Sequence, residues 1–161
     1  MERDMRLLAD AMLGTLARWL RVLGYDTVYD TTFSDNELVR LARAEGRVLL
    51  TRDHELARRR NLRVLLIESQ RLDAQMRQVF KEVALPCPDP YSRCLICNTQ
   101  LEPMLRSEAW GLAPPFVFIQ HDQFHLCPEC NKVFWRGTHW GRMNETVSAM
   151  CAAWEATHRK E

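Results

Sequence analysis

Residues 5–29 read MRLLADAMLGTLARWLRVLGYDTVY, and this stretch sets the pattern of the fold. A short apolar run, Met5–Ala9, ends at Asp10. Apolar residues then recur at helical spacing over residues 12–23, and a second strand is expected at Thr27–Tyr29. A strand, a helix and a strand in this order predict a right-handed crossover between parallel strands.

The same alternation of strands and helices continues to Ala84. Each later element is predicted from its apolar spacing and from the residues that begin or end it. Strands are expected at Arg47–Thr51 and Arg63–Ile67, and helices from Ser34, at His54–Arg60 and at Gln70–Val83. The predicted fold class is therefore α/β, with helices on both faces of a mostly parallel sheet.

The clearest boundary in the chain lies at residues 86–90, which read PCPDP. Prolines at this density are incompatible with a helix and form a stiff linker. We predict a first domain at residues 1–85 and a second at 91–161. In the second domain, a strand is expected at Phe116–Ile119 and a last helix at Asn144–His158.

The composition limits the classes of protein to consider. The 161 residues are 47% hydrophobic and carry a net charge of +1, which suits one domain with a real core plus a small module. A charge this close to neutral gives no global signal for binding polyanions. The charged start, Met1–Asp4, is unlike a secretory signal, and no apolar run is long enough to span a membrane. A cytoplasmic protein without membrane attachment is therefore expected.

Two CxxC motifs follow the linker. Each such turn lets two thiolates bind one ion, and two turns complete a tetrahedral zinc site with no open position. The predicted ligands of this structural zinc ion are Cys94, Cys97, Cys127 and Cys130. A pair of redox dithiols is the alternative, and His121, His125 and His139 are spare ligands if one cysteine does not bind. We favour a zinc ribbon, because metal binding would help so small a module to fold.

Three aspartates lie where a strand pattern gives way to a helix pattern: Asp10, Asp35 and Asp53. In an open α/β sheet such positions gather at the carboxyl edge, where ligands bind. Carboxylates collected there repel one another unless a cation lies between them. The pattern therefore suggests a site for a hard divalent cation.

Each aspartate can also be explained as part of a helix start. Asp10 and Asp53 precede helices, and aspartate is a favoured N-cap residue. Ser34 and Glu37 fit a capping box at the start of the second helix. Serine, threonine or asparagine would cap a helix without the repulsion, so three aspartates together favour the metal site.

Basic and aromatic residues suggest where nucleic acid could bind. Near the second CxxC motif, aromatic residues alternate with cations, a pattern able to stack bases and hold phosphates. The alternative is that these aromatics pack the ribbon on the first domain. The residues expected to contact nucleic acid are Arg18, Arg52, Arg136 and Trp140, with the run Arg58–Arg60 as a further candidate.

Four stretches together resemble the Mut-seven C-terminal RNase domain family. They are residues 10–26, Ser34-Asp35, residues 49–53 and residues 130–139. The resemblance covers nearly the whole chain and implies a PIN-like nuclease domain, with a parallel sheet flanked by helices, followed by a small zinc ribbon and a C-terminal helix. It also implies a divalent-metal ribonuclease whose catalytic acids are Asp10, Asp35 and Asp53.

The reaction implied by the resemblance is cleavage of RNA phosphodiesters by water activated at Mg²⁺ or Mn²⁺. Supporting roles are expected for Glu37, Thr51 and Glu55, and the choice among Glu37, Glu55 and Glu68 as a fourth acid is left open. The expected partner is RNA, and a homodimer is suggested only by analogy with PIN-like proteins.

Two features differ from the pattern common in PIN domains. Many of those domains place the second acid as a glutamate inside a helix, whereas this chain offers Asp35 or Glu37. Many also carry a small hydroxyl residue soon after the first aspartate, whereas Ala11 and Met12 follow Asp10. The alternative function, in which the acids serve only as helix caps, is a non-catalytic RNA-binding or regulatory zinc-ribbon module.

Overall fold

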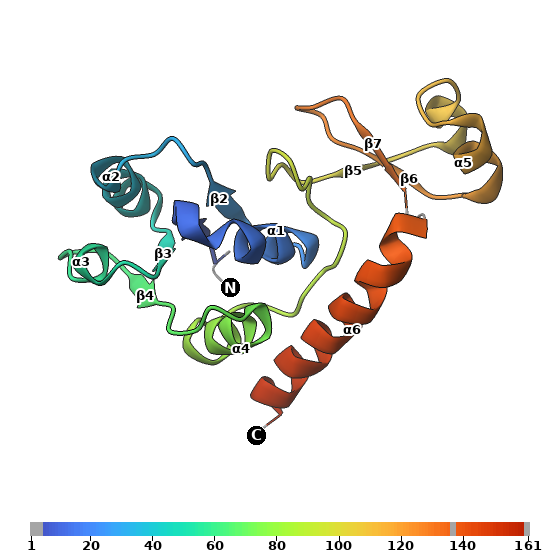
Figure 1. Ribbon diagram of the computed structural model, residues 1–161. Helices are drawn as coiled ribbons and strands as arrows, with labels where there is room; N and C mark the ends of the chain where they lie inside the picture. The colour runs from blue at the N-terminus through green and yellow to red at the C-terminus, as the bar shows by residue number, and fades with distance from the viewer. Residues whose placement is uncertain (1–4, 136–137, 160–161) are drawn as a thin grey trace.

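The first module is built on a parallel sheet (Figure 1). The computed structural model describes residues 5–135 and 138–159, and only the backbone within residues 138–142. The strands are β1 (Leu7–Ala9), β2 (Thr27–Tyr29), β3 (Val48–Thr51) and β4 (Val64–Leu66), in the spatial order β2-β1-β3-β4 and all parallel. The predicted α/β class and the parallel sheet are confirmed.

Helices cover both faces of this sheet. They are α1 (Gly14–Val22), preceded by the 3₁₀ helix η1 (Ala11–Leu13), then α2 (Asp35–Glu45), α3 (His54–Ala57) and α4 (Leu72–Glu82). Because side chains alternate along a strand, Leu7 and Leu50 face the layer of α1 and α4, whereas Leu8 and Leu49 face α2 and α3. Helix α3 ends at Ala57, three residues before the predicted end.

The second module is a three-stranded antiparallel sheet. Its strands are β5 (Glu102–Met104), β6 (Phe124–Leu126) and β7 (Val133–Trp135), in that spatial order. Between β5 and β6 lie the 3₁₀ helix η2 (Arg106–Ala109) and helix α5 (Pro115–Gln120). The predicted strand at Phe116–Ile119 is therefore wrong: Pro115 at the first helical turn starts a helix, and a short apolar run has no period to tell helix from strand.

The C-terminal helix α6 (Thr138–His158) begins six residues earlier than predicted. Figure 1 shows it running from the second module back to α4, and Val147 and Met150 share the core of α1 and α4. The indole Nε1 of Trp154 donates to the carbonyl of Leu85 at 3.2 Å. Helix α6 thus packs on the first module, although the division at residues 1–85 and 91–161 stays a prediction. In the described part of the chain, no helix combines the length and apolar character needed to cross a membrane.

The proline-rich linker is fixed against the end of α1. The amides of Asp89 and Tyr91 donate to the carbonyls of Leu23 and Val22 at 3.0 and 2.8 Å. Gly24 makes this close approach possible, since its φ is +91° and a Cβ there would lie 2.3 Å from the Asp89 carbonyl oxygen. The linker therefore holds the second module in one place beside the first.

Candidate functional site

At the carboxyl edge of the parallel sheet, one threonine links the side chain of Asp10 to the backbone of Asp53. Asp10 follows β1 and Asp53 follows the adjacent strand β3. The hydroxyl of Thr51 donates to Asp10 Oδ2 at 2.8 Å and accepts from the Asp53 amide at 2.9 Å. Thr51 is fully buried, so this pair of hydrogen bonds fixes the Asp10 carboxylate relative to the Asp53 backbone.

Both of these aspartates also cap helices. Asp10 Oδ1 accepts from the Ala11 amide at 2.6 Å, and Asp53 Oδ1 accepts from the amides of Glu55 and Leu56 at 2.8 and 3.2 Å. A carboxylate has about four lone-pair positions, so these hydrogen bonds do not exhaust either side chain as an acceptor. Capping and cation binding are therefore compatible at this edge.

The other predicted acids lie at the start of α2 and α3. Asp35 is exposed at the first position of α2. Glu37 Oε2 accepts from the Ser34 amide at 2.7 Å, and Ser34 Oγ accepts from the Glu37 amide at 3.2 Å, which makes the predicted capping box. Glu55 is exposed on the first turn of α3. Glu37 thus stabilises the helix start, as the alternative explanation requires.

The three predicted acids share one edge of the sheet but do not form a tight cluster. Among the residues that the structure describes, the four cysteines are the group whose potential ligand atoms all lie within 4.8 Å of one another. The carboxylates of Asp10, Asp35 and Asp53 do not form a second such group there. Their role as metal ligands stays a prediction.

The sequence reasoning overlooked Asp30. Ala9 pairs with Tyr29 in the register of β1 and β2, so Asp30 lies beside Asp10 at the carboxyl edge. Its Oδ1 accepts from the hydroxyl and the amide of Thr32 at 2.7 and 2.8 Å, and these hydrogen bonds hold the pKa of Asp30 below its usual range. The position directly after a predicted strand was the signal that could have found it.

The predicted nucleic-acid contacts fall into two groups. Arg18 is exposed on α1, and Arg52 lies half-buried between Thr51 and Asp53. The Nε atom of Arg52 is buried and has no hydrogen-bond partner among the described residues. Arg136 and the side chain of Trp140 lie outside the part of the chain that the structure describes.

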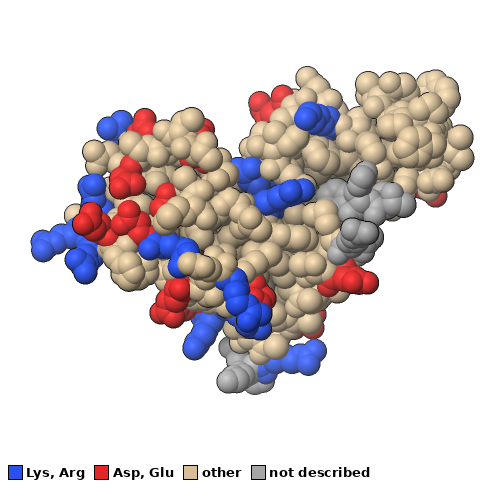
Figure 2. Space-filling view, in the orientation of Figure 1, with Lys and Arg blue, Asp and Glu red and all other residues tan. Residues whose placement is uncertain are grey.

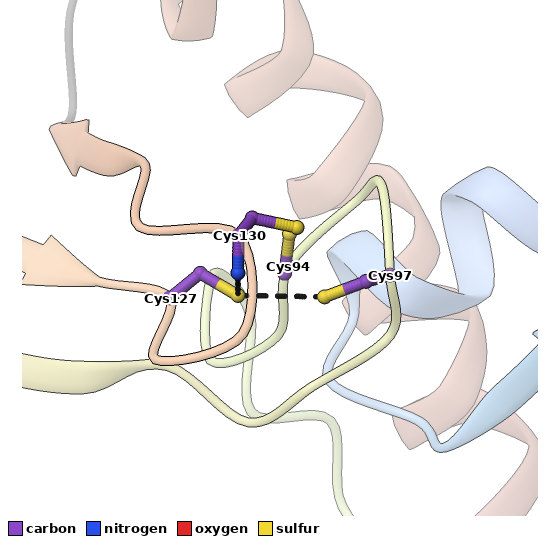
Figure 3. A group of neighbouring side chains, drawn as sticks. All are labelled: Cys94, Cys97, Cys127 and Cys130. Carbon is purple, nitrogen blue, oxygen red and sulfur yellow. Dashed lines mark hydrogen bonds between the residues drawn. The ribbon is translucent and has the colours of Figure 1, made fainter.

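The four predicted zinc ligands converge (Figure 3). One pair comes from the loop before β5 and the other from the turn between β6 and β7, and the Sγ atoms of Cys97 and Cys127 are 3.4 Å apart. The two turns share one geometry: the amides of Asn98 and Asn131 donate to the carbonyls of Cys94 and Cys127 at 3.0 and 2.8 Å. Four sulfur atoms from two such turns fit a tetrahedral zinc ion, and no histidine is needed.

The environment of these thiols favours a bound cation. Burial opposes ionisation of Cys97, but hydrogen bonds with Thr99 outweigh burial and lower the pKa of Cys97 to about 6. A hydrogen bond with Cys97 and partial desolvation raise the pKa of Cys130 to about 12. Four neighbouring thiols cannot all become thiolates cheaply unless a metal ion supplies the opposite charge.

The first cysteine turn is attached to the parallel sheet through Asn98. Its Oδ1 accepts from the Thr27 amide at the start of β2 at 2.9 Å, and its Nδ2 donates to Asp26 Oδ1 at 2.7 Å. Arg21 adds a hydrogen bond from Nη1 to the Leu95 carbonyl at 3.0 Å. These hydrogen bonds attach the first cysteine turn to β2, so loss of structure in the cysteine module should also destabilise this edge strand of the sheet.

Replacing Asn98 with glycine should destabilise the protein by about 1–3 kcal/mol, because the Thr27 amide loses its side-chain acceptor and Asp26 loses one of its two side-chain donors and keeps only Arg47. Glycine accepts the φ of +69° at this position, so the change isolates the side chain. Urea unfolding measures the effect. Asn61→Gly is the matched control, since Asn61 is exposed at a φ of +61°. Equal stability of the two variants would show that the Asn98 side chain does not hold the modules together.

Asp26 should make the stability of the protein depend on pH. Burial alone would raise the pKa of Asp26, but hydrogen bonds from Arg47 and Asn98 and the charges of Arg47 and Arg93 lower it below its usual range. Arg47 Nη1 lies 2.8 Å from Asp26 Oδ1. Because the folded-state pKa is depressed, this stabilisation is complete above the unfolded pKa of about 4 and is lost as the pH falls through the folded-state pKa.

Urea unfolding at a series of pH values checks this dependence. The wild-type protein should lose stability on acidification below about pH 4, and Asp26→Asn should flatten that part of the profile. An unchanged slope in the variant would assign the acid sensitivity to other carboxylates.

These features define a two-module class of protein: an α/β domain with acidic residues at the carboxyl edge of a parallel sheet, joined to a four-cysteine module able to bind a metal ion. The family model of the Mut7-C RNAse domain matches residues 5–147, and the chain belongs to that family. No curated protein and no solved structure matches the chain. The family indicates a nuclease-like role.

Proposed function

We propose that this protein is a divalent-metal-dependent ribonuclease whose active site is the carboxyl edge of the parallel sheet. Membership of an RNase-domain family supports the class of reaction. The observation that carries the proposal is the buried Thr51 at the end of a central strand, which bonds to the Asp10 carboxylate and to the backbone amide of Asp53. A threonine used only for packing would not need to orient the Asp10 carboxylate at this edge.

The donor set fits a hard cation. Asp10 and Asp53, with Asp35 across the edge, offer carboxylate oxygens, which Mg²⁺ and Mn²⁺ prefer. When bound there, such an ion would supply an activated water and stabilise the oxygen that leaves. In the proposed reaction the water oxygen bonds to phosphorus and the bond to the 3′ oxygen breaks. The 3′ oxygen takes up the water proton, so the products carry a 5′-phosphate and a 3′-hydroxyl.

Neighbouring residues have proposed supporting roles. Thr51 keeps Asp10 in position. Arg52 is half-buried between Thr51 and Asp53, and we assign its guanidinium group to the RNA phosphate near the cut. Arg18 on α1 is proposed to contact the RNA backbone further along. The proposed structural ion of the cysteine module is zinc.

A second candidate function is a non-catalytic RNA-binding module. The observation in its favour is that Asp10 and Asp53 both cap helices and Glu37 completes a capping box. If caps were their whole role, the edge would bind no ion. The two functions differ in whether RNA is cut.

Incubation of the purified protein with end-labelled single-stranded RNA separates the two functions. The ribonuclease should cut RNA with Mg²⁺ or Mn²⁺, stop in EDTA, and leave 5′-phosphate ends. Binding of RNA without cleavage under both metals would overturn the proposal and favour the binding module.

A further inference from the structure

An open groove lies between α2 and the chain that follows α3. It encloses about 470 Å³ and is lined by Asn36, Val39, Arg40, Arg43, Ala44 and Arg59. Three of these residues are arginines and none is acidic. Arg40, Arg43 and Arg59 are all exposed, so water and salt screen the repulsion among them, and the groove presents a positively charged surface that an anion can reach.

Two of the arginines are held in place by neutral acceptors. Arg43 Nη2 donates to the carbonyl of Arg60, and Arg59 Nη2 donates to Asn36 Oδ1 at 3.1 Å. One hydrogen bond runs from α2 to the chain after α3, and the other runs from that chain back to α2. Together they hold the two sides of the groove in place. Neither hydrogen bond places a carboxylate against a guanidinium group. Among the described residues, the ion pairs engage other arginines, namely Arg47, Arg71, Arg77, Arg106 and Arg159.

The groove begins next to the proposed active site. Asn36 lines one end and directly follows Asp35 at the start of α2. From there the lining residues of α2 lead away from the carboxyl edge, with Arg40 and Arg43 one turn apart on the same side. Figure 2 shows acidic and basic side chains interspersed over the part of the surface that α2 and α3 form.

We propose that this groove, which we call the α2–α3 arginine groove, binds the phosphate backbone of an RNA strand whose neighbouring nucleotides lie at the acidic edge. The inference rests on the proposed ribonuclease function. Guanidinium groups match phosphate oxygens in shape and charge. The groove is open and its charges are spread along a helix, which suits successive phosphates of a strand better than one small anion.

Binding of labelled single-stranded RNA, measured by fluorescence anisotropy in EDTA over a range of salt concentrations, tests the inference. Arg40→Gln/Arg43→Gln should weaken binding about tenfold and lower the salt slope of log K by about 1.4, that is about 0.7 for each phosphate of a single strand that is no longer neutralised. The matched control is Arg71→Gln/Arg77→Gln, because these arginines pair with Asp73 on α4, away from the groove. The control should bind as the wild type does.

Three results would contradict the proposal that the groove binds RNA. They are wild-type RNA affinity and salt slope in the Arg40/Arg43 double variant, an equal loss of RNA affinity in the control variant, and displacement of RNA by inorganic phosphate at equal concentration. If the double variant does not fold, as judged by circular dichroism, the single variant Arg40→Gln takes its place. Its salt slope should fall by about 0.7.

Failure of the groove and failure of the ribonuclease proposal give different results. Binding in EDTA needs no catalytic ion, so Asp10→Asn should bind RNA as tightly as the wild type does. If the groove variant binds RNA normally and cleavage depends on Asp10, the groove does not bind RNA but the proposed ribonuclease function stands. If the groove variant loses binding and Asp10→Asn leaves cleavage unaffected, the groove binds RNA but the proposed active site is wrong.

Discussion

Replacing Asp10 with asparagine should reduce metal-dependent RNA cleavage at least about a hundredfold while the protein stays folded. The asparagine amide oxygen can still accept from the Ala11 amide or from the Thr51 hydroxyl, so the local structure survives. The variant removes the negative charge, which a bound cation needs. Initial rates with labelled RNA at saturating Mn²⁺ measure the decrease.

The matched control for this variant is Asp73→Asn. Asp73 lies on α4 and pairs with the exposed Arg71 and Arg77 away from the carboxyl edge. The control should cut RNA at the wild-type rate. Cleavage that continues unchanged in Asp10→Asn would point to a contaminating nuclease and remove the proposed site.

Replacing Cys127 with serine should abolish binding of the proposed zinc ion and destabilise both modules. Cys127 is fully buried, and its cluster holds together strands that share only a small core. Structural zinc sites contribute about 10–16 kcal/mol of apparent binding free energy in small peptides. Even a net destabilisation of about 3 kcal/mol would lower the Tm by roughly 10 °C in a chain of this size. Zinc content and thermal unfolding followed by circular dichroism measure the two effects.

Cys87→Ser provides the control for the cysteine variant. Cys87 is exposed in the linker and lies outside the four-cysteine group. It should keep one zinc ion per chain and the wild-type Tm. A Cys127→Ser protein that retained full zinc content would show that the ligand set is wrong. Loss of zinc without a change at β2 would show that Asn98 does not couple the modules.

Much of the fold followed from the sequence, because buried strands and amphipathic helices have different periods. The strand at Thr27–Tyr29 lies where it was predicted. The element at Phe116–Ile119 could not be assigned from its apolar run, since burial of that short segment depends on the neighbouring sheet. The early start of α6 lay in a stretch without clear helical spacing.

The candidate site was predictable only in part. The spacing of the cysteines was sufficient to predict their convergence, because two short turns leave little freedom. An aspartate before a helix gives the same sequence pattern whether it caps the helix or binds a cation, and the sequence did not show that Thr51 bonds to the Asp10 carboxylate and to the Asp53 amide. Two features depend on tertiary structure that no local sequence pattern contains: the hydrogen bonds from Asn98 to the start of β2, and the lining of one groove by Arg43 and Arg59.

The central claim is that the carboxyl edge of the sheet holds a divalent cation. Anomalous X-ray scattering from crystals soaked in Mn²⁺ tests this most directly. We expect a manganese peak within ligand distance, about 2.2 Å, of an Asp10 carboxylate oxygen, with Asp53 or Asp35 as a second ligand. A manganese ion bound elsewhere in crystals of an active protein, with the Asp10 carboxylate bonded only to Ala11 and Thr51, would contradict it.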